Sequence, residues 1–141
     1  MVDPIADMFN RIRNAQAVRL PAVDLPFSNL KYEIAKILGK SGFIEKVERK
    51  KKRIKKTSQN RQQSWLKPAL EITLKYENKI PAISGLKKIS KPGQRIYTSW
   101  QKIKRVKSGY GLSVISTAKG LMTNKEARKN KIGGEIICEI W

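Results

Sequence analysis

The stretch GLSVISTAKGLMTNKEARKNKIGGEIICEI, residues 111–140, decides the fold of the C-terminal half of the chain. Apolar residues 112–115 predict a short strand, and the polar residues after them, 116–120, predict a turn. Alternation over residues 135–140 predicts a second, closing strand. Between these strands, Thr123 and Glu126 have the spacing of a capping box. We expect the helix that they open to stop at Gly133 and Gly134.

The predicted turn groups two hydroxyls, a cation and a glycine within five residues. Ser116 and Thr117 supply hydroxyls that donate and accept, and Lys119 supplies a positive charge. Gly120 has no Cβ, so another backbone can approach it closely. Together these groups can hold a phosphate and hydrogen-bond a base edge or a ribose hydroxyl. An ordinary polar hairpin turn is the alternative that the five residues leave open.

Three blocks of sequence resemble one known family. They are GLSVISTAKGLMT (111–123) with GGEIIC (133–138), DPIADM (3–8) with RIRN (11–14), and SKPGQRIY (90–97). In this order and spread over residues 3–141, they resemble ribosomal protein eight of the small subunit, in its bacterial and organellar form. The resemblance implies a structural protein that binds small-subunit rRNA directly in its central domain and supports subunit assembly and translation.

The resemblance also implies which residues contact the rRNA. These candidates are Arg13, Asn14, Lys31, Tyr97, Ser116, Thr117, Ala118, Lys119, Gly120, Gly134 and Glu135. For Arg13, Asn14 and Lys31 the alternative is an ordinary solvated side chain. For Tyr97 the alternative is an aromatic residue of the core with its hydroxyl hydrogen-bonded. Family members commonly carry a third hydroxyl where this chain has Ala118, so one side-chain hydrogen bond is missing. Family members in many bacteria also repress their own operon by binding its messenger RNA. The resemblance therefore makes the messenger RNA of this protein a further partner to test.

Composition favours a nucleic-acid partner and argues against an enzyme. The 141 residues include 31 Lys and Arg against 11 Asp and Glu, a net charge of +20, so a polyanion is the expected partner. With no histidine, the chain lacks the usual general base and the commonest metal ligand, and we expect no cofactor and no metal site. The single Cys138 suits a reducing compartment and a core position. No apolar run approaches the roughly twenty residues that span a bilayer, and no targeting segment is evident.

The N-terminal half predicts two helices and three strands. Asp3 and Pro4 begin a helix whose apolar stripe repeats every three or four residues, and an edge strand over residues 23–26 follows. Ser28 caps a second helix with the stripe Leu30, Ile34, Ile37 and Leu38, which ends at Gly42. Residues 43–53 predict a strand, and its partner alternates at Leu70, Ile72, Leu74 and Tyr76.

Residues 49–67 form a basic segment with nine Lys and Arg and no acid. Residues 57–64 are wholly polar, and we expect the segment to be a long, mobile hairpin loop that is disordered when free. The alternatives for this loop are an arm that binds rRNA, a solvated loop, and a basic cluster like a nuclear-localisation signal. Trp65 either stacks on a base or tucks into the second domain. Residues 78–125 also lack acids, with eleven basic residues. Within them, 83–89 predicts a strand, and the spacing of Trp100, Ile103 and Val106 predicts packing.

These patterns predict an α+β protein of two small domains that share an interface. The first is α-β-α-β-β over residues 1–78, and the second is mainly β with a short helix over residues 79–141. We expect a non-enzymatic rRNA-binding protein in the ribosome of a bacterium, or of an organelle that makes its own ribosomes. Its other expected partners are neighbouring small-subunit ribosomal proteins. We do not expect it to bind a membrane. A basic protein that packs RNA without sequence preference is the alternative function.

Overall fold

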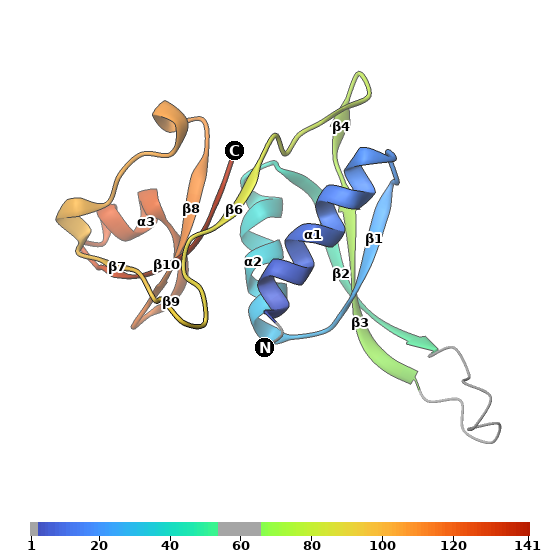
Figure 1. Cartoon of the computed structure of the whole chain (residues 1–141), viewed down its shortest axis with the longest axis horizontal. Helices are drawn as coiled ribbons and strands as arrows, with labels where there is room; N and C mark the ends of the chain where they lie inside the picture. Colours follow the sequence, from blue (N-terminus) through green and yellow to red (C-terminus); the bar gives the residue numbers. More distant parts are fainter. Residues whose placement is uncertain (1–2, 54–65) are drawn as a thin grey trace.

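The computed structural model of the chain describes residues 3–53 and 66–141, and the α+β class expected from the sequence is confirmed (Figure 1). The N-terminal region consists of α1 (Pro4–Ala17), β1 (Ala22–Pro26), α2 (Asn29–Lys40), β2 (Ile44–Arg53) and β3 (Leu66–Leu74). A two-stranded ribbon of β4 (Tyr76–Glu77) and β5 (Ile80–Pro81) follows. The rest of the chain is mainly strand with the short helix α3 (Asn124–Lys129).

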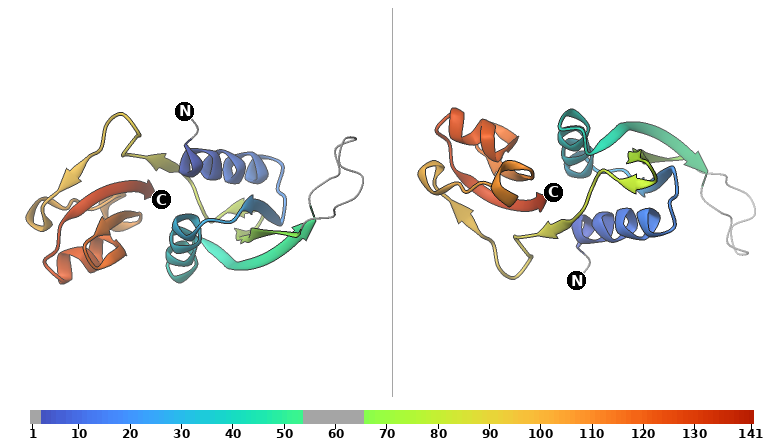
Figure 2. Two further views of the ribbon diagram at one scale, coloured as in Figure 1. Left: turned by 90° about the horizontal axis from the view of Figure 1, so that it is seen from below. Right: turned by 90° about the horizontal axis from the view of Figure 1, so that it is seen from above.

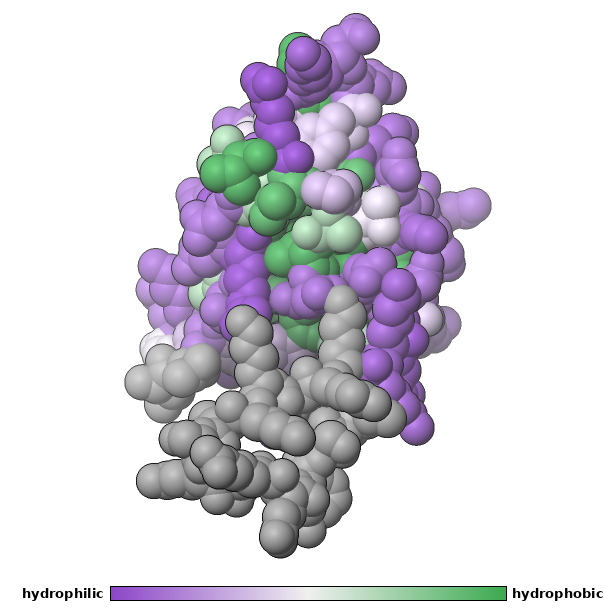
Figure 3. Space-filling model, turned by 90° about the vertical axis from the view of Figure 1, so that its right-hand side faces the viewer, coloured by the Kyte–Doolittle hydropathy of each residue, from purple (hydrophilic) through white to green (hydrophobic). Residues whose placement is uncertain are grey.

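The N-terminal strands form an antiparallel sheet in the order β1-β3-β2, so β1 is the edge strand that Pro26 requires. Leu70, Ile72 and Leu74 of β3 are all buried, and α1 and α2 cover this face of the sheet (Figures 1 and 2). Viewed from the right-hand side of Figure 1, the described part of the surface is mostly hydrophilic around a hydrophobic strip (Figure 3).

Both N-terminal helices begin at the residues that the sequence indicated. The Asp3 carboxylate accepts hydrogen bonds from the N–H groups of Ile5 (3.1 Å) and Ala6 (3.2 Å). The Ser28 hydroxyl accepts one from Lys31 N–H at 3.2 Å. The end of α2 is also as predicted: Lys40 is its last residue, Ser41 is the C-cap, and Gly42 follows with a φ of +83°. Leu30 is not a stripe residue: it lies in the first turn of α2, beyond the core, and is 42% exposed.

The described ends of the basic segment are strand, not loop. Residues 49–53 of β2 pair with residues 66–70 of β3, because strand pairing rests on backbone hydrogen bonds, which basic side chains do not interrupt. The expected loop of residues 49–67 is therefore wrong at both ends. Its polar part, residues 57–64, and Trp65 lie outside the described residues. Tyr76 also leaves β3: it belongs to β4, and its hydroxyl donates to Leu20 O at 2.7 Å.

The C-terminal sheet has the order β6-β10-β8-β9, with β7 also paired to β10. Its strands are β6 (Leu86–Lys88), β7 (Tyr97–Thr98), β8 (Leu112–Thr117), β9 (Gly120–Thr123) and β10 (Gly134–Ile140). The strand expected over residues 83–89 is shorter, since Ser84 and Gly85 turn away to donate to Trp141 O. Thr123 caps α3 by accepting from Glu126 N–H at 3.2 Å. That helix ends at Lys129 rather than at the glycines, because Asn130 caps it and Lys131 adopts a positive φ.

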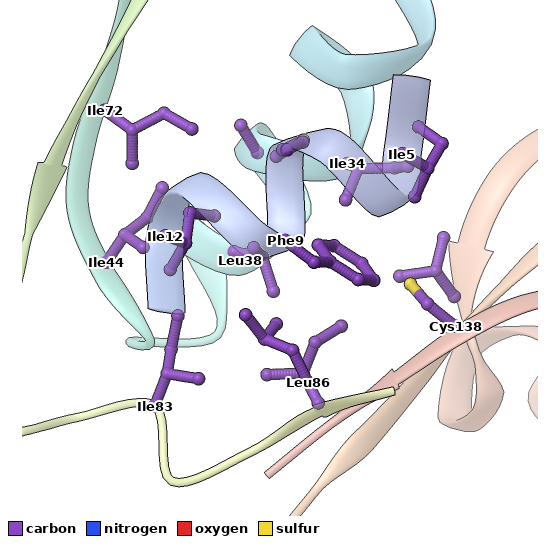
Figure 4. Close-up of a cluster of buried hydrophobic side chains, with 14 of the residues drawn as sticks. Ile5, Phe9, Ile12, Ile34, Leu38, Ile44, Ile72, Ile83, Leu86 and Cys138 are labelled. Carbon is purple, nitrogen blue, oxygen red and sulfur yellow. The ribbon is translucent and has the colours of Figure 1, made fainter. Parts of the chain in front are cut away.

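One hydrophobic core joins the N-terminal and C-terminal regions. Phe9 and Leu38 from the helices lie in the same buried cluster as Leu86 and Cys138 from the C-terminal sheet (Figure 4). A smaller cluster around Ile115 lies under α3, and Trp100 and Ile103 pack in it. The packing predicted for Trp100, Ile103 and Val106 is thus confirmed, although their segment forms short 3-10 turns. Among the described helices, none is both long and apolar enough to cross a membrane.

Candidate nucleic-acid interface

The turn between β8 and β9 is tighter than the sequence suggested. β8 continues through Ser116 and Thr117, and Thr117 pairs with Gly120, so only Ala118 and Lys119 form the turn. Both of these residues are exposed. The expectation of a turn over all five residues is corrected, because the strand ladder continues until the chain must reverse. The outcome is a two-residue hairpin whose tip presents a cation.

The Thr117 hydroxyl holds this turn in shape. It donates to Gly120 O at 2.8 Å and accepts from Lys119 N–H at 3.1 Å. A hydroxyl has one proton, so Thr117 has none left to donate to a ligand. The half-buried Ser116 makes no side-chain hydrogen bond with the described residues, and neither does the Lys119 ammonium. Ser116 and Lys119 are therefore the free donors, and Thr117 positions them.

Two glycines shape the site for different reasons. Gly120 adopts a φ of +106°, and a Cβ there would meet nothing within 4 Å, so its role is backbone conformation. The close approach expected at Gly120 occurs instead at Gly134. A Cβ on Gly134 would lie 2.1 Å from Ser116 O, so only glycine lets β10 pass β8 at this level.

Strand pairing brings Tyr97, Glu135 and Ser116 into one row. Glu135 pairs with Tyr97 of β7 on one side and with Ser116 of β8 on the other. Residues paired directly across antiparallel strands point to the same face, so the three side chains share one face of the sheet. Tyr97 is 69% exposed, and the alternative of a core aromatic is wrong.

Arg95 balances the one acid in this row. Its Nη1 lies 3.1 Å from Oε1 of Glu135, whose side chain is 18% exposed. An unpaired carboxylate here would repel a phosphate, and the ion pair removes that repulsion. Sequence reasoning did not include Arg95 among the candidates. Its only signal was its place two residues before Tyr97 in the SKPGQRIY block.

Lys31 lies apart from this row, in the first turn of α2, and an rRNA contact by it stays a prediction. It is 6% exposed, so the alternative of a solvated lysine is wrong, and its Nζ donates to Pro26 O at 3.2 Å. Lys31 and Arg95 line one cleft of about 550 Å³ between the start of α2 and the C-terminal sheet. This cleft connects Lys31 to the row through Arg95.

Arg13 and Asn14 are not brought to the β8–β9 turn. Both are on α1, which lies in the N-terminal region away from that hairpin (Figure 1). The Arg13 guanidinium donates to Leu86 O and to Asn10 Oδ1, so it links α1 to β6. The Asn14 side chain is exposed. An rRNA contact by either residue stays a prediction.

The described residues contain no cluster of His, Cys, Asp and Glu that fits a metal ion. The lone thiol, Cys138, is free and buried, and burial raises its pKa to about 12. A thiol with such a pKa is not a nucleophile at neutral pH. The chemistry that the site offers is therefore hydrogen bonding, charge and stacking.

Comparisons with known proteins agree with this chemistry. The sequence profile of the family described as Ribosomal protein S8 matches residues 3–141. The small ribosomal subunit protein uS8 of Thermoanaerobacter sp. (strain X514) is 49% identical over 142 aligned positions, which cover 100% of this chain and 98% of the relative. The protein of the same name from Kosmotoga olearia is 48% identical and covers 99% and 98%, and that of Clostridium beijerinckii is 44% identical and covers 100% and 98%. The chain belongs to the ribosomal protein S8 family.

Proposed function

We propose that this chain is a structural, non-enzymatic constituent of the small ribosomal subunit that binds the central domain of its rRNA through the β8–β9 turn and the row beside it. The observation that carries the proposal is the alignment of Tyr97, Glu135 and Ser116 next to a turn with two free donors. The membership of the ribosomal protein S8 family, whose members are ribosomal proteins by name, supports it.

The geometry suits an irregular RNA segment better than a regular duplex. An A-form duplex hides its base edges in a deep groove, so base recognition requires unstacked bases. The Ser116 hydroxyl can donate to a base or ribose, Lys119 can neutralise a phosphate, and the exposed Tyr97 ring can stack. Because Thr117 and Gly134 fix the turn against β10, these groups are ordered before the RNA arrives.

Substitutions within the turn separate contact from positioning. Ser116→Ala removes one donor and should weaken binding to a central-domain rRNA fragment by about 1 kcal/mol, roughly fivefold. Thr117→Ala removes both hydrogen bonds of the turn and should weaken it more, by about 2 kcal/mol. Lys87→Gln is the control, because Lys87 is exposed on β6 outside this row.

The measurement is equilibrium binding to the rRNA fragment and to a scrambled duplex of equal length. The Ser116 and Thr117 variants should lose affinity for the fragment alone. Equal losses on both RNAs would contradict the proposal and favour a protein that packs RNA without preference.

Its partners are the small-subunit rRNA and neighbouring ribosomal proteins, and its location is the ribosome of the bacterial cytoplasm, since the relatives named above are small ribosomal subunit proteins by name. The proposal also includes binding of the protein to its own messenger RNA, which would repress its synthesis. If one site serves both RNAs, a messenger fragment should compete with the rRNA fragment, and Ser116→Ala should weaken both complexes. A messenger fragment that binds without competing would separate the two roles.

A further inference from the structure

A second basic surface lies at the other end of β8. Leu112, where β8 begins, and Thr117, where it ends, are separated by roughly 17 Å of extended chain. At the Leu112 end, two adjoining clefts of about 340 and 400 Å³ share the residues Gly109, Asn124 and Lys125. One extends to Arg105 and Arg128, and the other extends past Tyr110 to the end of α2.

The first cleft has a fixed frame. Asn124 is 2% exposed, accepts from Ser113 N–H at 3.4 Å and donates to Lys104 O at 3.3 Å. Arg128 donates from Nη2 to Ile103 O at 3.0 Å. Both side chains thus tie the segment before β8 to α3. The rest of the Arg128 guanidinium, with its further N–H groups, lies at the cleft.

The cations of the two clefts are not neutralised by the described part of the chain. Arg105 and Lys125 are exposed, and neither forms an ion pair with any described residue. Lys40 adds a further positive charge in the second cleft. Glu126 is the one acid that lines either cleft. The excess of positive charge fits an anionic partner.

An exposed aromatic ring stands beside these cations. Tyr110 is 89% exposed, the highest value among the large hydrophobic residues that the structure describes as exposed. Its neighbour Gly111 is fixed, since a Cβ there would lie 2.6 Å from Ile140 O. Lys107, Ser108 and Gly109 before it all have positive φ, and the Lys107 ammonium lies 4.8 Å from the Trp141 ring. This anchored turn directs Tyr110 outward.

We infer that this surface is a second RNA-binding site, which takes a single-stranded segment with one base stacked on Tyr110 and phosphates at Arg105, Lys125 and Arg128. An aromatic ring among cations is the arrangement by which proteins bind unpaired nucleic acid. A protein partner would need a larger apolar centre, and Tyr110 is the only large exposed hydrophobic residue among the lining residues. The inference goes beyond the function proposed above, because it concerns the opposite end of β8.

The test uses the full chain and a mixed-sequence single-stranded RNA of about 12 nucleotides, within the usual site size. Tyr110→Ala should lose about tenfold in affinity for this RNA, whereas Tyr110→Phe keeps the ring and should stay within about twofold. Arg105→Gln should lower the slope of log affinity against log salt by about 0.7, as expected for one phosphate contact. Lys87→Gln is the matched charge control and should leave the affinity unchanged.

A direct readout accompanies the affinities. The same RNA carrying 5-iodouridine should crosslink to Tyr110 on irradiation, and mass spectrometry would locate the adduct. Because Tyr110 is exposed, its variants should unfold with unchanged midpoints in urea, so a loss of binding would not reflect a loss of fold.

Three outcomes would overturn the inference. They are an unchanged affinity of Tyr110→Ala, equal losses for Arg105→Gln and Lys87→Gln, and a purified small-subunit protein that binds at Tyr110 and excludes the RNA. Failure here is distinguishable from failure of the proposed function. Ser116→Ala should lower the affinity for the rRNA fragment and leave the affinity for the single-stranded RNA unchanged. Tyr110→Ala should lower the affinity for the single-stranded RNA.

Discussion

The N-terminal and C-terminal regions differ in how many acids they contain and in how many of those acids form ion pairs. In the N-terminal region, four acids on α1, α2 and the sheet pair with local cations, in the ion pairs Arg11–Asp7, Lys36–Glu33, Lys46–Glu48 and Lys50–Glu71. Residues 79–141 contain fourteen Lys and Arg but three acids, namely Glu126, Glu135 and Glu139. Of these three, Glu135 alone forms an ion pair within the described residues, with Arg95.

This difference supports the proposal that the C-terminal region contacts the RNA. A cation that already has a carboxylate partner has little charge left to neutralise a phosphate, whereas an unpaired one releases counterions on binding. Exposed ion pairs add little to the free energy of unfolding. The main effect of these acids is therefore to lower the net positive charge of the N-terminal region. The comparison supports placing most of both proposed RNA-binding surfaces in the C-terminal region, with Lys40 of α2 at the edge of the second.

The largest expected effect is at the crossing of β10 and β8. Gly134→Ala places a Cβ where Ser116 O lies 2.1 Å away, so the strands must separate. The free energy of unfolding should fall by about 3 kcal/mol, typical of overpacking, and rRNA binding should fall with it. Gly93→Ala is the control, since a Cβ there meets nothing within 4 Å. Urea denaturation measures both, and a Gly134→Ala variant as stable as its control would refute the crossing geometry.

The next effect concerns the contact between the two regions. Asp3 caps α1 and also pairs with Lys88 of β6. Asp3→Ala should lower the free energy of unfolding by about 1–2 kcal/mol, and Asp3→Asn, which can still cap, should lower it less. Asp7→Ala is a matched control, because the Asp7–Arg11 pair is exposed and lies within α1. Equal losses for Asp3→Ala and Asp7→Ala would show that Asp3 does not join the regions.

The same contact gives a pH dependence with a defined sign. Burial raises the pKa of the Asp3 carboxyl, but hydrogen bonds from Lys88 and from the backbone of Ala6 and Ile5 outweigh it, and the pKa lies below its ordinary value of 3.8. A lowered pKa adds stability above the ordinary value, and that stability is lost as the pH falls through 3.8 toward the folded pKa. Asp3→Asn should therefore show a shallower loss of stability than the parent chain in acid titrations followed by circular dichroism.

A smaller effect tests the charge comparison itself. Lys119→Gln should reduce the salt slope of rRNA binding by about 0.7–0.9, the value for one phosphate contact. Lys46→Gln should leave the slope unchanged, because Lys46 lies 2.7 Å from Glu48. If the two variants reduced the slope equally, net charge alone would govern binding.

The last prediction is that the Cys138 thiol does not react while the chain is folded. Cys138 lies where the two regions share a core, and burial raises its pKa to about 12. A thiol reagent at pH 8 should modify it only after unfolding. Rapid modification of the folded chain would mean that the regions separate readily.

The sequence predicted the elements better than their partners. Asp3, Ser28 and Thr123 marked helix starts correctly, because capping depends on residues within one turn. The row of Tyr97, Glu135 and Ser116 could not be derived by spacing, since it depends on the register of three strands far apart in the chain. The burial of Lys31 and the bond from Arg13 to Leu86 were likewise invisible, because both are tertiary contacts. The domain boundary at residue 78 stays a prediction.

The measurement that tests the central claim most directly is the salt dependence of binding to a central-domain fragment of small-subunit rRNA, beside a scrambled duplex of equal length. The account predicts that the specific complex survives rising salt while the scrambled one dissociates, and that Ser116→Ala brings the two curves closer together. Two curves that fall together from the start would mean that charge alone explains binding, and the β8–β9 turn would then be scaffold.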